Sequence, residues 1–377
     1  MDEPLRLSGA RFTARYRLSG TAESARLMAA DICVEQTVEF PLDLIHRADI
    51  KAQIIGEVCS LEAVDRDCHE AEIAYAVETA GRELTQLLNV VFGNSSLKPG
   101  IQLVSLTLPE ALAGLYRGPR FGVAGLRALV GAPERPLVCT AIKPLGLSSE
   151  ALAELAYQFA TGGVDFIKDD HGLTDQSFGR FADRVHAVCR RVQQANEETG
   201  GTCRYLPNVT APADEVMERA RLAKEAGAGG VLVAPGLTGL DTQRRLADDD
   251  TIALPVFSHP AFQGAFTVHQ DAGITPGVLF GTLNRLGGAD AAIFPNFGGR
   301  FSFAEAACRD LAERARAPLG QLRALFPVPA GGMSLERVRE MRRFYGDDVI
   351  LLIGGDLHRH GASVAEGARR FVAAVRE

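Results

Sequence analysis

The sequence predicts an α/β protein, with a C-terminal (β/α)8 TIM barrel preceded by an N-terminal ferredoxin-like α+β domain. From Val138 onward, apolar stretches rich in strand-forming residues recur eight times in about 240 residues, the usual size of such a barrel. Helical patterns of about 10 to 20 residues follow most of these stretches. An open doubly wound sheet would usually carry a Gly-x-Gly-x-x-Gly turn after its first strand, and none is present. We therefore expect an N-terminal domain over residues 1–130 and a barrel with the active site over residues 131–377.

The N-terminal elements follow from alternating and helical patterns. Apolar residues alternate with polar ones from Ala10 to Leu18, as in a strand with one buried face. Thr21 is a candidate N-cap for the helix behind it. The expected elements are a helix at Glu23–Ile32, an extended segment at Val34–Leu42, strands at Ala52–Leu61, His69–Val77 and Gly100–Leu108, a helix at Gly81–Leu88 and a short apolar segment at Val90–Gly93. Strands interleaved with two helices favour a sheet with helices on one face.

The barrel elements come after a linker rich in Gly, Arg and Pro, from roughly Gly114 to Pro136. Loops that leave the carboxyl ends of barrel strands converge around the axis, so the functional residues are expected there. Helices are expected at Ser149–Thr161, Phe178–Ala195 and Pro212–Ala226. The eight strands are expected to begin near Val138, Val164, Cys203, Gly230, Leu254, Ala291, Leu325 and Val349.

The composition of the chain limits the kinds of binding partner that we expect. The chain has 377 residues, 46% of them hydrophobic and 23% charged, and a net charge of −7. Because it is acidic and lacks a basic run, nucleic acid is not expected to be a partner. No apolar run approaches the roughly 18 residues of a spanning helix, and the start of the chain lacks a signal-peptide pattern. The seven cysteines show no Cys-x-x-Cys spacing, so we expect reduced thiols in a cytoplasmic protein without a membrane partner.

The second barrel strand ends in a charged cluster, Lys168-Asp169-Asp170-His171. On one strand Lys168 and Asp170 lie two residues apart, so both side chains point the same way. With His171 just past the strand end, they form a candidate ligand set for a divalent cation. The alternative is a solvated turn in which Asp170 or His171 caps the next helix.

Other strand ends carry further candidates. Lys143 follows strand one, where a desolvated lysine can exchange protons near neutral pH; a snorkelling surface lysine is the alternative. His259 follows strand five, where it is a candidate for substrate contact, although a lone histidine is more often structural than catalytic. Gly-Gly turns after strands seven and eight expose N–H groups where β/α barrels commonly bind phosphate. These turns are Gly331–Gly332 and Gly354–Gly355, while His358 and His360 beyond them either line the same mouth or lie in a solvated loop.

Two of these segments resemble motifs of the RuBisCO large-chain family. Gly162–His171 resembles its Gly-Gly-Leu-Asp-Phe-Thr-Lys-Asp-Asp-Glu motif, and 139–148 resembles its Thr-Ile-Lys-Pro-Lys-Leu-Gly-Leu-Ser motif. The resemblance implies that CO2 carbamylates Lys168, that the carbamate and Asp170 bind Mg2+, and that Lys143 is a catalytic acid/base. His171 stands where the family has Glu. A neutral imidazole removes one negative charge and favours softer ions such as manganese or zinc, or it acts instead as a proton donor.

The resemblance extends to further residues. It implies that His259 contacts the substrate beside the metal, and that the paired glycines bind a substrate phosphate. Arg300 falls where the family has a loop lysine, although the glycines beside it could form an anion site of their own. Glu35 matches a glutamate that completes the active site of the neighbouring subunit. We therefore expect a homodimer or a multiple of dimers.

The second strand-one lysine, the loop lysine and the strand-six histidines of RuBisCO are missing, which argues against CO2 fixation. The match is better to RuBisCO-like (form IV) proteins, which form a metal-stabilised enediolate from a phosphorylated substrate. Our leading hypothesis is a 3-oxo-isoapionate 4-phosphate decarboxylase. The alternatives are a transcarboxylase/hydrolase on the same substrate, or an enolase or isomerase of a methylthio-ribulose-type sugar phosphate, which would need an apolar pocket. A non-catalytic sugar-phosphate binder and a Schiff-base aldolase are the rival classes.

Overall fold

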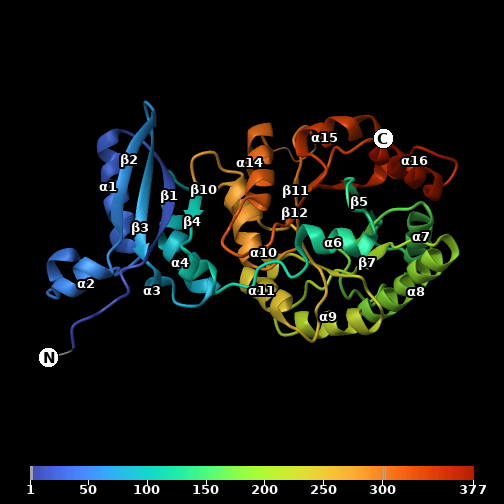
Figure 1. Ribbon diagram of the computed structural model, residues 1–377, viewed down its shortest axis with the longest axis horizontal. Coiled ribbons are helices and arrows are strands. Elements are labelled where there is room, and N and C mark those ends of the chain that lie inside the picture. The colour runs from blue at the N-terminus through green and yellow to red at the C-terminus, as the bar shows by residue number, and fades with distance from the viewer. Residues whose placement is uncertain (1–2, 300, 302) are drawn as a thin grey trace.

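The chain forms a sheet domain beside a barrel domain (Figure 1). The computed structural model describes residues 3–299, 301 and 303–377. No helix in these ranges is both long and apolar enough to cross a membrane. The predicted fold class, a β/α barrel with an N-terminal ferredoxin-like domain, is confirmed.

The N-terminal sheet has the strand order and connections of a ferredoxin-like fold. Strand β1 (Arg11–Ser19) pairs antiparallel with β3 (Cys68–Ala76) and β4 (Ile101–Thr107), and β2 (Glu57–Asp65) pairs with β3. Alternate residues of β1 are buried, as the sequence pattern predicts. The helices of this domain are α1 (Ala22–Glu35), α2 (Ala48–Gln53), α3 (Val77–Ala80) and α4 (Leu84–Phe92), with 3-10 turns at Leu42–Leu44 and Asn94–Leu97.

Three boundaries predicted for this domain are wrong. Helix α1 continues to Glu35, where an extended segment is expected from Val34. The first residues of the strand expected at Ala52–Leu61 belong instead to α2, and the helix expected to end at Leu88 continues to Phe92, through most of the apolar segment Val90–Gly93. Tertiary contacts explain why α1 continues past Val34. The Gln36 side chain donates to the Asn89 and Val90 carbonyls and fixes the end of α1 against α4.

Eight parallel strands form the barrel in the order β7-β6-β5-β13-β12-β11-β9-β8. The seam between β7 and β8 is closed by one bridge, Asn208 to Leu232. Each strand lies near its predicted position. The strands are β5 (Leu137–Ile142), β6 (Phe166–Asp169), β7 (Arg204–Leu206), β8 (Val231–Val233), β9 (Val256–Ser258), β11 (Ala291–Pro295), β12 (Phe326–Ala330) and β13 (Ile350–Ile353).

Helices surround the barrel, and one of them closes the end at which the strands begin. Leu126 and Val130 of α6 (Gly122–Val130) pack with inward-facing strand residues such as Phe166 and Phe257. Because this amino-terminal end is filled, the site has to lie at the opposite end, where the loops meet. The main outer helices are α7 (Ser149–Thr161), α8 (Phe181–Thr199), α9 (Val216–Glu225), α11 (Leu240–Asp248), α14 (Glu305–Arg316), α15 (Val338–Tyr345) and α16 (Val364–Arg376). Shorter helical segments are α5 (Glu110–Ala113), α10 (Pro235–Thr238), α12 (Gly264–Thr267), a π-helix at Gly277–Leu283, α13 (Asn284–Leu286), and 3-10 turns at Leu335–Arg337 and Gly355–His358.

A short strand from the barrel joins the two domains. Strand β10 (Gly273–Ile274), in the loop that follows β9, adds parallel to β4 at the edge of the N-terminal sheet. Arg314 of α14 also donates to the Val104 carbonyl of β4, at 3.1 Å. Helix α1 lies on the side of the sheet domain away from the barrel (Figure 1).

Candidate active site

The lysine at the end of β6 is buried. Lys168 is only 3% exposed, and its Nζ donates a hydrogen bond to the Asp169 carbonyl at 2.8 Å. Burial is the main cause that lowers the pKa of Lys168 below its usual value. A lysine with a lowered pKa is more often an uncharged amine at neutral pH, which is the form that reacts with CO2.

Asp169 points to the opposite side of β6 and anchors the strand, a role that the sequence analysis missed. Its carboxylate pairs with Arg184 of α8 at 3.2 Å, and accepts from the Tyr205 hydroxyl at 2.6 Å and from the Asn208 N–H at 2.9 Å. The Asn208 side chain donates to the His171 and Leu173 carbonyls. The period-2 alternation of a strand could have signalled that Asp169 faces away from its neighbours.

The structure brings Lys143, Asp170 and His171 together at the carboxyl end of the barrel. Lys143 Nζ lies 3.8 Å from Asp170 Oδ2, and His171 Nδ1 lies 3.4 Å from Asp170 Oδ1. Neither Asp170 nor His171 caps the next helix, because α8 begins only at Phe181. The helix-capping alternative is therefore wrong.

His259 stacks against His171 across this end of the barrel. The ring centroids are 4.7 Å apart and the planes are inclined by 10°. The His259 Nδ1 atom accepts from the Ala261 N–H at 3.2 Å, which assigns the proton of a neutral ring to Nε2. Burial, together with the nearby Lys168 and His171, lowers the pKa of His259 well below its usual value. His259 is thus a neutral imidazole at physiological pH.

The two Gly-Gly turns lie at the same rim. Gly331 and Gly332 have φ angles of +84° and +67°, which strongly favour glycine. A Cβ added at Gly332 would lie 2.8 Å from the Gly299 Cα, so the turn after β12 touches the loop after β11. A Cβ added at Gly354 would lie 3.6 Å from Lys143 Nζ, which places the turn after β13 beside the lysine.

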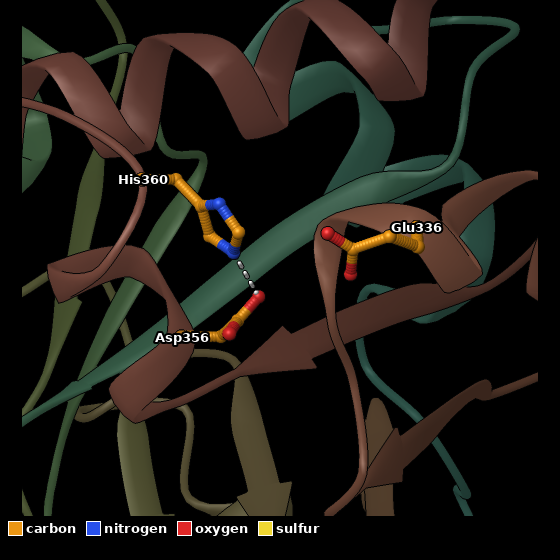
Figure 2. Close-up of side chains that lie close together, drawn as sticks. All are labelled: Glu336, Asp356 and His360. Carbon is orange, nitrogen blue, oxygen red and sulfur yellow. Dashed lines mark hydrogen bonds and ion pairs between the residues drawn. The ribbon is translucent and has the colours of Figure 1, made fainter.

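The remaining candidates lie elsewhere. Glu35 ends α1 in the N-terminal domain, where it accepts from Asn94 Nδ2 at 3.0 Å. Arg300 lies outside the described residues. His358 is exposed and meets the Phe159 ring edge-on. Figure 2 shows His360 hydrogen-bonded to Asp356, with Glu336 beside the pair.

A divalent cation fits the donor chemistry at the end of β6. The Asp170 carboxylate and the His171 ring nitrogen already converge at 3.4 Å, as neighbouring ligands of one ion do. Lys168, two residues away on the same side of the strand, would supply an anionic oxygen if it were carbamylated. Without that modification an amine is a poor ligand for Mg2+, which prefers oxygen.

A two-domain α/β fold of this topology, with a lysine–acid–histidine cluster at the barrel mouth, defines a class of protein. The model of one protein family, described as ribulose bisphosphate carboxylase large chain, catalytic domain, matches residues 122–376 of this chain. The chain belongs to the RuBisCO large-chain family, and its resemblances place it among the RuBisCO-like proteins.

Proteins of known name and structure agree with this placement. A 5-methylthioribulose-1-phosphate isomerase of Rhodospirillum rubrum is 43% identical, covering 97% of this chain and 96% of the relative. A 2,3-diketo-5-methylthiopentyl-1-phosphate enolase of Geobacillus thermodenitrificans is 34% identical, covering 81% and 74%. The crystal structure of a RuBisCO-like protein from Rhodopseudomonas palustris is 42% identical, covers 98% of each chain and superposes with a TM-score of 0.89.

Proposed function

We propose that this protein is a metal-dependent isomerase of a 5-methylthioribulose-1-phosphate-type sugar phosphate, acting through an enediolate. The observation that carries the proposal is the grouping of Lys143, Asp170 and the Gly354 turn at the rim of the barrel. This grouping puts a proton-transfer group, a metal-ligand candidate and a phosphate-binding turn within reach of one small substrate. The similarity to the Rhodospirillum rubrum isomerase over nearly the whole chain supports the same choice.

The decarboxylase hypothesis is not supported. The named relatives are an isomerase and an enolase of methylthio compounds, which favours the alternative that the sequence left open. That alternative needs apolar surface for the methylthio group. The loops that follow β5, β6 and β9 carry exposed Leu145, Phe178 and Phe262, and these side chains offer such surface around the barrel mouth.

In the proposed mechanism each residue has one task. A cation held by Asp170, His171 and a carbamate on Lys168 would supply charge stabilisation for the enediolate oxygens. Lys143 takes a proton from the carbon beside the carbonyl and returns it to the former carbonyl carbon. The hydroxyl proton passes from one enediolate oxygen to the other, so the former hydroxyl becomes the new carbonyl and the atoms balance. The N–H groups of the Gly331–Gly332 and Gly354–Gly355 turns hold the phosphate. Neutral His259 donates a hydrogen bond from Nε2 to a substrate oxygen.

The test is turnover in D2O followed by NMR. With Mg2+ and 5-methylthioribulose 1-phosphate, the wild type should form an isomer that carries deuterium at the former carbonyl carbon, which receives the proton. Lys143→Met should lower kcat by about 100-fold or more, the usual worth of a positioned general base. Lys51→Met, at an exposed lysine of α2, should retain full activity. CO2 release from 3-oxo-isoapionate 4-phosphate, without any isomerisation of the methylthio substrate, would contradict the proposal.

A further inference from the structure

A second group of metal-ligating side chains lies on the loops after β12 and β13. Ligand atoms of Glu336, Asp356 and His360 all lie within 4.8 Å of one another. Figure 2 shows the Glu336 carboxylate turned toward the Asp356–His360 pair. The group shares no residue with the cluster at the end of β6.

Hydrogen bonds hold two of the three donors in place. His360 Nε2 lies 2.9 Å from Asp356 Oδ2, and the same oxygen accepts from the Leu335 N–H at 3.1 Å. Asp356 therefore links the loop after β13 to the loop after β12. The Asp356 and His360 side chains are only 19% and 24% exposed, so their positions are restricted by packing.

No lysine or arginine of the described residues pairs with the two carboxylates of this group, those of Glu336 and Asp356. The adjacent Arg337 pairs with Glu340 instead. Two carboxylates that converge on one imidazole repel each other, and a bound cation relieves this repulsion. Exposed Glu336 leaves the group open to entry of an ion.

We propose that Glu336, Asp356 and His360 form a second divalent-cation site, separate from the one at the end of β6. One imidazole nitrogen and two carboxylate oxygens suit zinc or manganese better than magnesium, which rarely takes nitrogen ligands. The ion joins the two loops that continue from the Gly331–Gly332 and Gly354–Gly355 turns. It stiffens that rim of the barrel mouth.

The experiment measures binding of Zn2+ and Mn2+ alone, by equilibrium dialysis with elemental analysis. It uses the full-length protein carrying Asp170→Asn, which disables the other site. This protein should bind one equivalent. Added Asp356→Asn or His360→Ala should weaken that binding at least tenfold, and Glu336→Gln by a smaller factor. Glu313→Gln, at an exposed acid of α14, removes the same charge outside the group and should leave binding unchanged.

Hydrogen–deuterium exchange supplies an independent readout. Zn2+ should slow amide exchange over residues 331–336 and 354–360 in the Asp170→Asn protein, and should have no effect once His360→Ala is added. Because His360 and Glu336 are not fully buried, these variants keep the test valid if Asp356→Asn fails to fold. Absence of a bound equivalent, or binding that survives both His360→Ala and Glu336→Gln, would overturn the proposal and leave Asp356 as a hydrogen-bonded link only. Neither result depends on which reaction the enzyme catalyses.

Discussion

At the scale of single residues, adjacent side chains at the end of β6 point to opposite sides of the strand and have different roles. Lys168 and Asp170 were predictable as partners, because residues two apart on a strand share a side. The contacts of Asp169 with Arg184 and Tyr205 were not predictable, since they come from α8 and β7 and depend on how the barrel closes. The stacking of His171 on His259 likewise joins segments nearly 90 residues apart and leaves no local pattern in the sequence.

The lowered pKa of Lys168 leads to a prediction about its modification. Carbamylation needs the neutral amine, whose fraction rises as the pH rises through the pKa. Since burial lowers this pKa, the carbamate should form at a lower pH than on an exposed lysine. We expect a carbamate 13C signal with 13CO2 that grows as the pH is raised and disappears in Lys168→Arg. Lys224→Arg is the matched control on the surface, and an unchanged signal in Lys168→Arg would refute the assignment.

At the scale of elements, the eight barrel strands were predictable, even those of three residues, whereas strand β10 was not. Eight apolar stretches give the barrel strands because each is buried on both sides. The two-residue strand β10 carries too little pattern to be recognised, and it exists only because β4 offers a free edge. The Gly-Gly turns were predictable as turns with exposed N–H groups, but the contact of Gly332 with Gly299 was not.

That contact separates two otherwise similar substitutions. Gly331→Ala and Gly332→Ala each force a side chain into a left-handed conformation, at a cost of about 1–2 kcal/mol. At Gly331 the added Cβ meets no atom within 4 Å, whereas at Gly332 it meets the Gly299 Cα at 2.8 Å. Gly332→Ala should therefore destabilise the fold by about 1–3 kcal/mol more than Gly331→Ala, as measured by urea unfolding. It should also weaken inorganic phosphate binding more, and equal effects would argue against contact between these loops.

At the scale of the whole molecule, the fold class follows from the sequence, but the assembly of subunits does not. Helix α1, which ends at Glu35, lies on the side of the sheet domain away from the barrel (Figure 1). Glu35 itself contacts Asn94 and Lys98 of the N-terminal domain. Beyond it, Phe40 and Leu44 leave about half of their surface exposed, as expected for residues that another subunit covers.

Mixed dimers test whether Glu35 acts in the neighbouring subunit. Glu35→Gln alone and Lys168→Ala alone should each be nearly inactive, because every site in either homodimer carries one lesion. If Glu35 completes the partner's site, a mixed dimer has one site with both lesions and one intact site. Random mixing of equal amounts then restores about one quarter of wild-type activity, since half of the dimers are mixed and half of their sites are intact. Glu23→Gln, at an exposed acid of the same helix, should be fully active alone. If mixing restores nothing while subunit exchange is demonstrated by mass spectrometry, Glu35 does not act across the interface.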